Sequence, residues 1–341
     1  MSKRARIGSW AAALALLLIG PFFLQSTSYA FVIRLAGIAG LYMLLALGLN
    51  LVIGFTGLLD LGFMAFYAIG AYTAAILAIH KVPFIACVAA AVAASTLVRV
   101  MVGFPALRLR GDYLAIVTLG FGEVVRLTLT NWDSLTNGPK GLPRVGEAIP
   151  SASLFGVILS SNLHYYYLIF ACVLGAIWVC ARLNHSRLGR AWVAIREDEI
   201  AAELMGVEVT QQKVVAFGLS AMFAGLAGAI FAHWEGFVTP ESFTFWESCL
   251  LVCAVVLGGM GSIMGVVLGA LCIVLVPEIL RDMLGSSFAN ARYLLFGLSL
   301  ILMTVYRPQG IWPSRRRTLE LSARGAEEET PADSLFDAER K

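Results

Sequence analysis

Among the ionisable residues that stand inside long apolar runs of this sequence, Asp60, Glu123 and Arg126 are the candidates for chemistry. A charge inside a membrane is costly, so such residues are default candidates for a functional role. Glu123 and Arg126 are three residues apart, which places them on one helix face where they can neutralise each other. Asp60 follows a glycine-rich turn and can cap the helix that begins there. A structural and a functional role are both open for each of them.

No catalytic motif accompanies these residues. HExxH, GxSxG and GxGD do not occur, which leaves an intramembrane protease unsupported. The phosphate-binding motif GxxxxGK[ST] does not occur either, so this chain cannot itself hydrolyse ATP. The six cysteines lie in apolar runs without a CxxC, and the four histidines are scattered. We therefore expect no metal site, cofactor or disulfide, and the chain is not predicted to be an enzyme.

The elements that position these residues must be membrane spans. Hydrophobic residues make up 59% of the chain and charged residues 14%, and the mean hydropathy is +0.81. The apolar runs are long enough to cross a bilayer repeatedly, at about 20 residues per crossing, and they lack the alternation of barrel strands. The net charge of +3 comes from basic loops and does not predict nucleic-acid binding. The predicted fold class is all-α, a polytopic membrane protein with about ten transmembrane helices.

The ten spans are predicted with both termini in the cytoplasm. The first could mimic a cleaved signal peptide, but the second follows so closely that an uncleaved span is favoured. The last three are short, and the glycines at 258–261 could instead form a re-entrant pair. The predicted spans are 9–24, 31–53, 60–79, 83–104, 113–131, 164–183, 214–234, 245–257, 263–280 and 293–306.

The basic residues support this orientation. Lys and Arg in the predicted cytoplasmic segments outnumber those outside by about three to one, and a shift by one span would reverse the bias. Segment 132–163 is then an external loop. The transmembrane domain is predicted to cover residues 1–313, and the acidic tail 314–341 is predicted to be cytoplasmic and disordered.

Segment 184–213 is the longest polar interruption and is predicted to be cytoplasmic. We expect one short helix that starts near Ser186, an N-cap residue type, and stops at Gly206. Ile195, Ala202 and Met205 would share one side, and charged residues would cover the rest. A solvated connector and a docking helix are both open on composition alone.

Glycines recur at helix-packing spacing. Three of them form a tandem GxxxG, two lie close together on the seventh span, and two open the turn between the eighth and ninth spans. Small residues let helix backbones approach closely in lipid, either within this subunit or against a second one. The glycines assigned to packing are Gly225, Gly228, Gly258, Gly259, Gly261, Gly265 and Gly269.

Six blocks, in the same order along the chain, resemble the M-type permeases of branched-chain amino-acid ABC importers. The resemblance covers residues from about 35 to 313. The blocks are GLNLVIGFTGLLDLGFMAFYAIGAY, LRLRGDYLAIVTLGFGEVVRL with TNWDSLTNGP, GRAWVAIREDEIAAELMGVEV, GFVTPESFTFWES, VVLGGMGSIMG and YRPQGIWP.

The resemblance implies a BtuC-like type II importer fold in the bacterial inner membrane. Besides lipid, it implies four partners: an H-type permease, two ATPase subunits and a periplasmic substrate-binding protein. In this family a short cytoplasmic helix docks into a groove of the ATPase. The residues that the resemblance assigns to this coupling are Gly189, Arg190, Arg196, Glu197, Asp198, Glu199, Ala202, Glu203, Met205 and Gly206.

The implied function is that of a permease subunit of an ATP-driven importer for branched-chain or similar amino acids. Urea and short amides remain alternative substrates, because near relatives move them. An ion-gradient-driven secondary transporter is the rival class, and it would be expected to show internal repeats and an ionisable relay. The external rim carries Glu235, Glu241 and Glu247, which are ordinary loop residues or part of a docking surface. The polar candidates for the substrate path are Asn50, Thr56, Thr118 and Glu123.

Overall fold

The computed structural model describes residues 30–106, 111–150, 152–154, 157–159 and 161–284, together with 297, 298, 301, 306 and 310–312. The predicted first span at 9–24 and the tail at 314–341 lie outside the described residues. Most of the predicted tenth span at 293–306 does so too. The remaining predicted spans can be compared with the structure.

A helix accounts for each of these spans. The helix α2 (Ala30–Asn50) continues as a π-helix, η2 (Leu51–Thr56). Five helical segments of the described chain are long and apolar enough to cross a membrane, and three shorter apolar helices accompany them. The all-α class is confirmed, and the count of ten spans stays a prediction. The other long helices are α3 (Phe63–Ile79), α4 (Phe84–Ala106), α5 (Asp112–Asn131), α7 (Asn162–Asn184), α10 (Val209–Glu235), α11 (Phe245–Gly258) and α12 (Ile263–Leu284).

Two helix starts differ from the predicted spans. The helix α3 begins at Phe63, three residues after Asp60, because residues 57–62 are not helical. The helix α10 begins at Val209, ahead of the apolar run that starts at 214. Gln and Lys are good helix formers, so the helix continues through polar residues that a hydropathy criterion leaves out.

The helix α10 lies at the centre of the bundle, where it packs against α2, α3 and α4. The buried share of the membrane span is 78% in the segment that contains α2 and 67% in α10, but only 17% in α5. A helix that is apolar on all sides suits a central position, whereas the outer helices present apolar surface to lipid or to another subunit. The two central helices therefore form the scaffold on which the others are placed.

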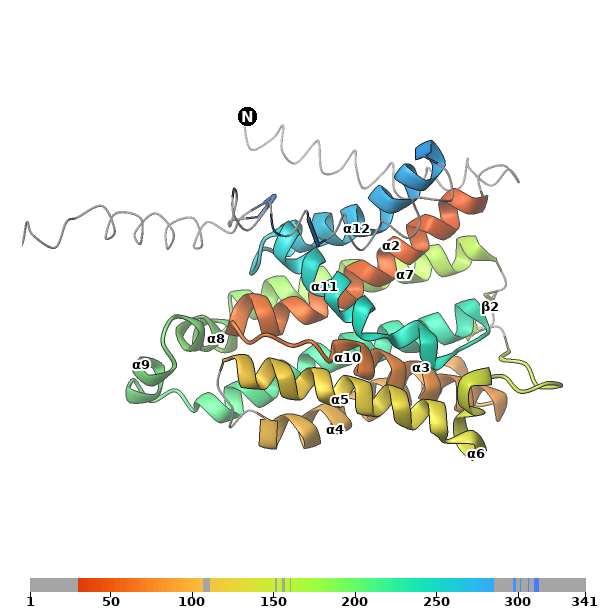
Figure 1. The fold of residues 1–341 in the computed structure, drawn as a ribbon, viewed down its shortest axis with the longest axis horizontal. Helices are drawn as coiled ribbons and strands as arrows, with labels where there is room; N and C mark the ends of the chain where they lie inside the picture. The colour runs from red at the N-terminus through yellow and green to blue at the C-terminus, as the bar shows by residue number, and fades with distance from the viewer. Residues whose placement is uncertain are drawn as a thin grey trace, which may run out of the picture.

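The polar elements gather at two opposite ends of the bundle. Figure 1 shows α8 (Arg187–Glu197) and α9 (Glu199–Leu204) at one end, and α6 (Asp133–Thr136) and strand β2 (Val157–Ile158) at the other. This separation agrees with the predicted assignment of segments 184–213 and 132–163 to opposite sides of the membrane.

The end that holds α6 is built from small elements. A short 3-10 helix, η3 (Gly138–Lys140), follows α6, and strand β1 (Ser153–Leu154) pairs antiparallel with β2, with Ser153 opposite Ile158. A second 3-10 helix, η4 (Pro240–Phe243), comes after α10. The backbones of Leu142 and Val238 exchange two hydrogen bonds of 2.9 and 2.8 Å, which join the two predicted external segments.

Glycines sit where helix backbones come closest. A Cβ on Gly228 would lie 2.5 Å from the carbonyl oxygen of Tyr67 and 2.6 Å from the nitrogen of Ala71, so α10 and α3 touch backbone to backbone. A Cβ on Gly225 would lie 2.8 Å from the carbonyl oxygen of Ala91 in α4. Only glycine permits such distances, which bring three helices together around α10.

The remaining packing glycines join α11 to α12. Gly265 and Gly269 face Gly258 and Ala254 across the two helices, at distances that leave no room for a Cβ. Gly259 and Gly261 lie in the connecting turn with φ angles of 115° and 81°. Gly261 therefore precedes α12 and is not part of a helical GxxxG face.

We predict that Gly228→Ala weakens the α3–α10 contact, because the added methyl group overlaps backbone atoms that cannot move independently. Overpacking of this kind costs about 1–3 kcal/mol. The measurement is the apparent melting temperature of the protein in detergent. Gly175→Ala in α7 is the matched control, because a Cβ at Gly175 would meet no atom within 4 Å. Equal melting temperatures for the two variants would contradict the prediction.

Candidate functional site

A buried ion pair lies between the segment that precedes α3 and the helix α4. Arg99 donates from Nη2 to Oδ2 of Asp60 at 2.5 Å, and the exposed fractions of the two side chains are 2% and 0%. The other carboxylate oxygen of Asp60 accepts from the backbone N–H of Gly62 at 3.1 Å. Removing two charges from water is costly, and only close pairing with further hydrogen bonds offsets the cost.

Two aromatic rings enclose the guanidinium of Arg99. Its central carbon lies 4.3 Å from the ring centroid of Phe66 in α3 and 4.1 Å from that of Phe217 in α10. Cation–π attraction is strongest when the cation is desolvated, as it is here. Arg99 thereby connects α4 to α3, α10 and the segment before α3.

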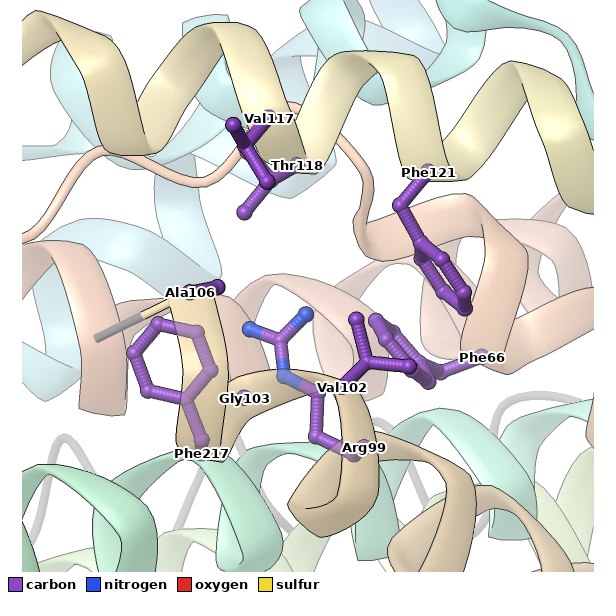
Figure 2. A pocket seen from close by; sticks show the side chains of 9 residues that line it. All are labelled: Phe66, Arg99, Val102, Gly103, Ala106, Val117, Thr118, Phe121 and Phe217. Atoms are coloured by element: carbon purple, nitrogen blue, oxygen red, sulfur yellow. The ribbon is translucent and has the colours of Figure 1, made fainter. Parts of the chain in front are cut away.

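A small cavity opens beside this guanidinium. Figure 2 shows Arg99 on α4 with its guanidinium directed toward Thr118 of α5, and Phe121 and Phe66 at one side. The Nε atom of Arg99 has no hydrogen-bond partner within the described chain. The cavity has room for about one water molecule, so it cannot hold an amino acid. Its geometry is that of a structural anchor.

The sequence interpretation of this region needs two corrections. Asp60 does not cap α3, since the N-cap position is Gly62 and the N–H of Met64 in the first turn donates to Oγ of Ser248 at 3.4 Å. The count of basic residues places Arg99, which falls near the end of the predicted span 83–104, with the cytoplasmic charges, whereas it is buried within α4. The available sequence signal for their pairing is that Arg99 lies inside one apolar run and Asp60 at the start of a neighbouring one.

The four candidate path residues do not form one site. Thr118 accepts from the N–H of Leu61 at 3.1 Å and donates to Ala115 at 3.0 Å. Thr56 is buried and donates to the carbonyl oxygen of Val52, one turn earlier in η2, at 2.7 Å. Of the four, Thr118 is the one that reaches the cavity beside Arg99.

The other two candidates have separate roles in packing. Asn50 is fully buried, and its Oδ1 accepts from the N–H of Gly261 at 2.9 Å, which joins the end of α2 to the turn before α12. Glu123 forms an ion pair with Arg126 on α5, including a 3.0 Å hydrogen bond from Nε. The expected pairing of these two charges is therefore present.

The predicted coupling segment forms two helices where one was expected. Asp198 has extended backbone angles of −155° and 115°, and it separates α8 from α9. Its side chain accepts from the N–H groups of Ile200 and Ala201 at 2.8 and 3.0 Å, so it caps α9. Ser186 caps α8 through the N–H of Gly189, and Gly206 follows α9 with a φ of 85°.

The first of these helices is fixed firmly to the bundle. Trp192 is buried, stacks on Phe55 of η2 and donates from Nε1 to the carbonyl oxygen of Gln212 at 2.9 Å. Arg196 donates from Nη1 to the carbonyl oxygen of Gly54, also in η2, at 2.7 Å. The helix α8 is therefore in direct contact with the π-helix that ends the second span.

The second helix presents a partly apolar outer face. Ala202 packs inward with Ile195 and Val209, but Met205 is 85% exposed and does not join them, which corrects the predicted apolar side. Leu204 is 83% exposed. Leu204 ends α9 and Met205 is its C-cap, and both are turned away from the bundle.

The charges of this segment divide between inward and outward positions. Glu199 pairs with Lys213 of α10 at 2.8 Å, and Lys213 is only 2% exposed, so this carboxylate fixes α9 to α10. Arg190 donates to the carbonyl oxygen of His185 at 3.2 Å. Glu197 and Glu203 are exposed, and Gly189 is buried against the end of α7.

The opposite end of the bundle holds the three glutamates of the predicted rim. Glu235 pairs with Arg34 at 2.8 Å, and Glu247 accepts from the hydroxyl of Tyr42 at 2.6 Å, so both stabilise contacts with α2. Glu241 is exposed on η4. Within the described chain, no group of three or more His, Cys, Asp or Glu side chains could hold a metal ion.

Known proteins resemble the chain over most of its length. The family model described as the permease component of the branched-chain amino acid transport system matches residues 31–304. The high-affinity branched-chain amino acid transport system permease protein LivM of Salmonella typhimurium is 41% identical over 337 residues, which cover 91% of this chain and 76% of LivM. LivM of Escherichia coli K12 is 41% identical over 334 residues with the same coverage.

More distant similarity extends to the other permease of these systems. The permease protein LivH of Salmonella typhimurium is 25% identical over 287 residues, which cover 79% of this chain and 90% of LivH. No solved structure matches the chain significantly.

We predict that Arg99→Met destabilises the protein by about 3–5 kcal/mol, because it leaves the Asp60 carboxylate buried without a partner. The double variant Asp60→Asn with Arg99→Met removes both charges and should recover part of this loss. The measurement is the apparent melting temperature in detergent of the two variants and the parent. A double variant no more stable than Arg99→Met would contradict the assignment of a buried charge pair.

Proposed function

The chain belongs to the family of permease components of branched-chain amino acid transport systems, and from this we propose that it carries branched-chain amino acids across the membrane in an ATP-driven importer. It is a transport permease and not an enzyme. The observation that carries the proposal is the 41% identity to LivM over 91% of the chain. Uptake of leucine, isoleucine and valine is the expected activity.

A second permease subunit completes the proposed path. LivH, named as a permease of the same kind of system, is itself similar to this chain over 79% of its length. Two related subunits can enclose a path between them, with each supplying an outer face of its bundle. The outer helices α4, α5 and α7 offer such faces, because less than a third of each span is buried in the single chain.

The energy for transport comes, in this proposal, from separate ATPase subunits. The phosphate-binding motif GxxxxGK[ST] does not occur in the 341 residues of the sequence. The outer face of α9 is the proposed docking surface, with Leu204 and Met205 as apolar anchors and Glu203 at its edge. Exposed apolar groups rimmed by charges are typical of a protein interface.

Two contacts pass motion from this docking surface into the membrane. The ion pair of Glu199 with Lys213 fixes α9 to α10, and the hydrogen bond from Arg196 to Gly54 fixes α8 to η2. A displacement of α8 and α9 by the ATPases is thereby delivered to two of the buried helical segments. We place this end of the bundle in the cytoplasm, and we place the opposite end, with α6 and η4, toward a periplasmic binding protein.

We predict that the chain, expressed with its H-type permease, ATPases and binding protein, restores leucine uptake to a bacterium that lacks its own branched-chain importers. Uptake of labelled leucine should fall when ATP is depleted. Labelled urea and acetamide, tested in the same cells, should not accumulate. Uptake of urea or acetamide without uptake of leucine would contradict the proposed substrate. Leucine uptake that needs only an ion gradient would contradict the proposed ATP-driven mechanism.

We predict that Leu204→Asp weakens ATPase docking. A leucine that becomes buried at the interface contributes about 2 kcal/mol to the free energy of binding, which is roughly a 30-fold change in affinity. The measurement is the amount of ATPase subunit that copurifies with the permease pair. Thr210→Asp adds the same charge at another exposed position on this end of the bundle and should retain the ATPase. If the Leu204→Asp variant copurifies with the normal amount of ATPase, α9 is not part of the docking surface.

A further inference from the structure

The segment between η2 and α3 is non-helical backbone inside the bundle. Figure 1 shows residues 57–62 as an orange trace that runs from the end of η2 to the start of α3. The helix α3 has 17 residues, so its length is about 25 Å, which is shorter than a hydrocarbon core of about 30 Å. The segment therefore makes up part of the membrane crossing.

Contacts with two neighbouring helices fix the depth of this segment. Asp60 pairs with Arg99, which lies seven residues before the end of α4. Leu61 donates to Thr118, which lies six residues after the start of α5. The end of α4 and the start of α5 are neighbours along the chain, and at 1.5 Å per residue both contacts lie about 10 Å inside that common end.

The carbonyl oxygens of this segment lack hydrogen-bond donors in the part of the chain that the structure describes. Of the residues that the structure describes, none donates a hydrogen bond to the carbonyl oxygens of residues 57–61. Polar backbone at membrane depth is tolerated only where it is covered by protein or lines a water-filled cavity. Asp60 is fully buried, but the other four residues are partly or fully exposed. Their carbonyl oxygens, which have no donor among the described residues, therefore need water, a substrate or another subunit.

The side chains show which side of the segment is open. Asp60 is turned inward to Arg99, and Leu58 packs against a small apolar cluster that contains Phe217. Leu59 is 39% exposed, and Gly57 is exposed as well. The open side is thus held in place by the ion pair behind it, and it faces away from the bundle.

We propose that Gly57, Leu58, Leu59 and Leu61 line the aqueous path of the assembled importer, with carbonyl oxygens that accept hydrogen bonds from water and from the ammonium group of the passing amino acid. The identity of that substrate rests on the proposed function. An ammonium group donates three hydrogen bonds and matches a row of acceptors that carries no net charge. Neutral acceptors bind the substrate without holding it as strongly as a carboxylate would.

The test is chemical labelling of two cysteine variants in the complete importer. Leu59→Cys places a thiol on the open side of the segment. Leu97→Cys is the control at equal depth, because Leu97 is 62% exposed on α4 and lies two residues from Arg99. A positively charged methanethiosulfonate reagent reacts only with thiols that water reaches. Mass spectrometry separates the labelled site from the six native cysteines.

Leu59→Cys is expected to react at least tenfold faster than Leu97→Cys, and the attached group is expected to reduce leucine uptake at least tenfold. Equal labelling rates at the two positions, whether slow or fast, would overturn the proposal, and so would full uptake after Leu59→Cys is modified. Leucine uptake by the parent importer is measured first. Its failure would affect the proposed function alone, because the labelling ratio does not depend on which substrate is carried.

A second measurement avoids any substitution. Hydroxyl-radical footprinting of the unmodified complex marks side chains in contact with water. Leu59 should be oxidised more than Met101, which is 66% exposed on the outer face of α4, although methionine is the more easily oxidised type. Stronger oxidation of Met101 would contradict an aqueous path along the segment.

Discussion

The bundle depends on one buried charge pair. Arg99 and Asp60 are shielded from water, and the rings of Phe66 and Phe217 close the two faces of the guanidinium. Four pieces of the chain meet at this point: the segment before α3, and the helices α3, α4 and α10. Apolar helices in lipid gain little from burial alone, so specific polar contacts of this kind determine how they are arranged.

Much of the helical framework could be predicted from the sequence, because a span of about 20 apolar residues has few alternatives in a membrane. The pairing of Asp60 with Arg99 could not be, since it joins residues 39 positions apart and depends on how the helices pack. The break at Asp198 was missed for a different reason. Its neighbours are good helix formers, and this composition concealed a residue of N-cap type in the middle of the segment.

The candidate site could be predicted less well than the fold. Thr118 was identified as a polar group in a span, but its partner is the backbone N–H of Leu61. A hydrogen bond to a distant backbone group cannot be predicted from residue types. Glu199 was expected to face an ATPase, whereas it reaches back to the buried Lys213. A charged residue on a polar helix can point either way, and only the position of the neighbouring helix decides between them.

The central position of α10 has a consequence for how the protein is made. The helices that it holds together are early in the chain, whereas α10 itself ends at Glu235. At ribosomal rates, the interval between completion of α4 and completion of α10 is on the order of 10 s. During that interval Phe217 has not taken its place, so one face of Arg99 lacks its final cover. A newly inserted chain is thus most vulnerable to quality-control proteases before its central helix arrives.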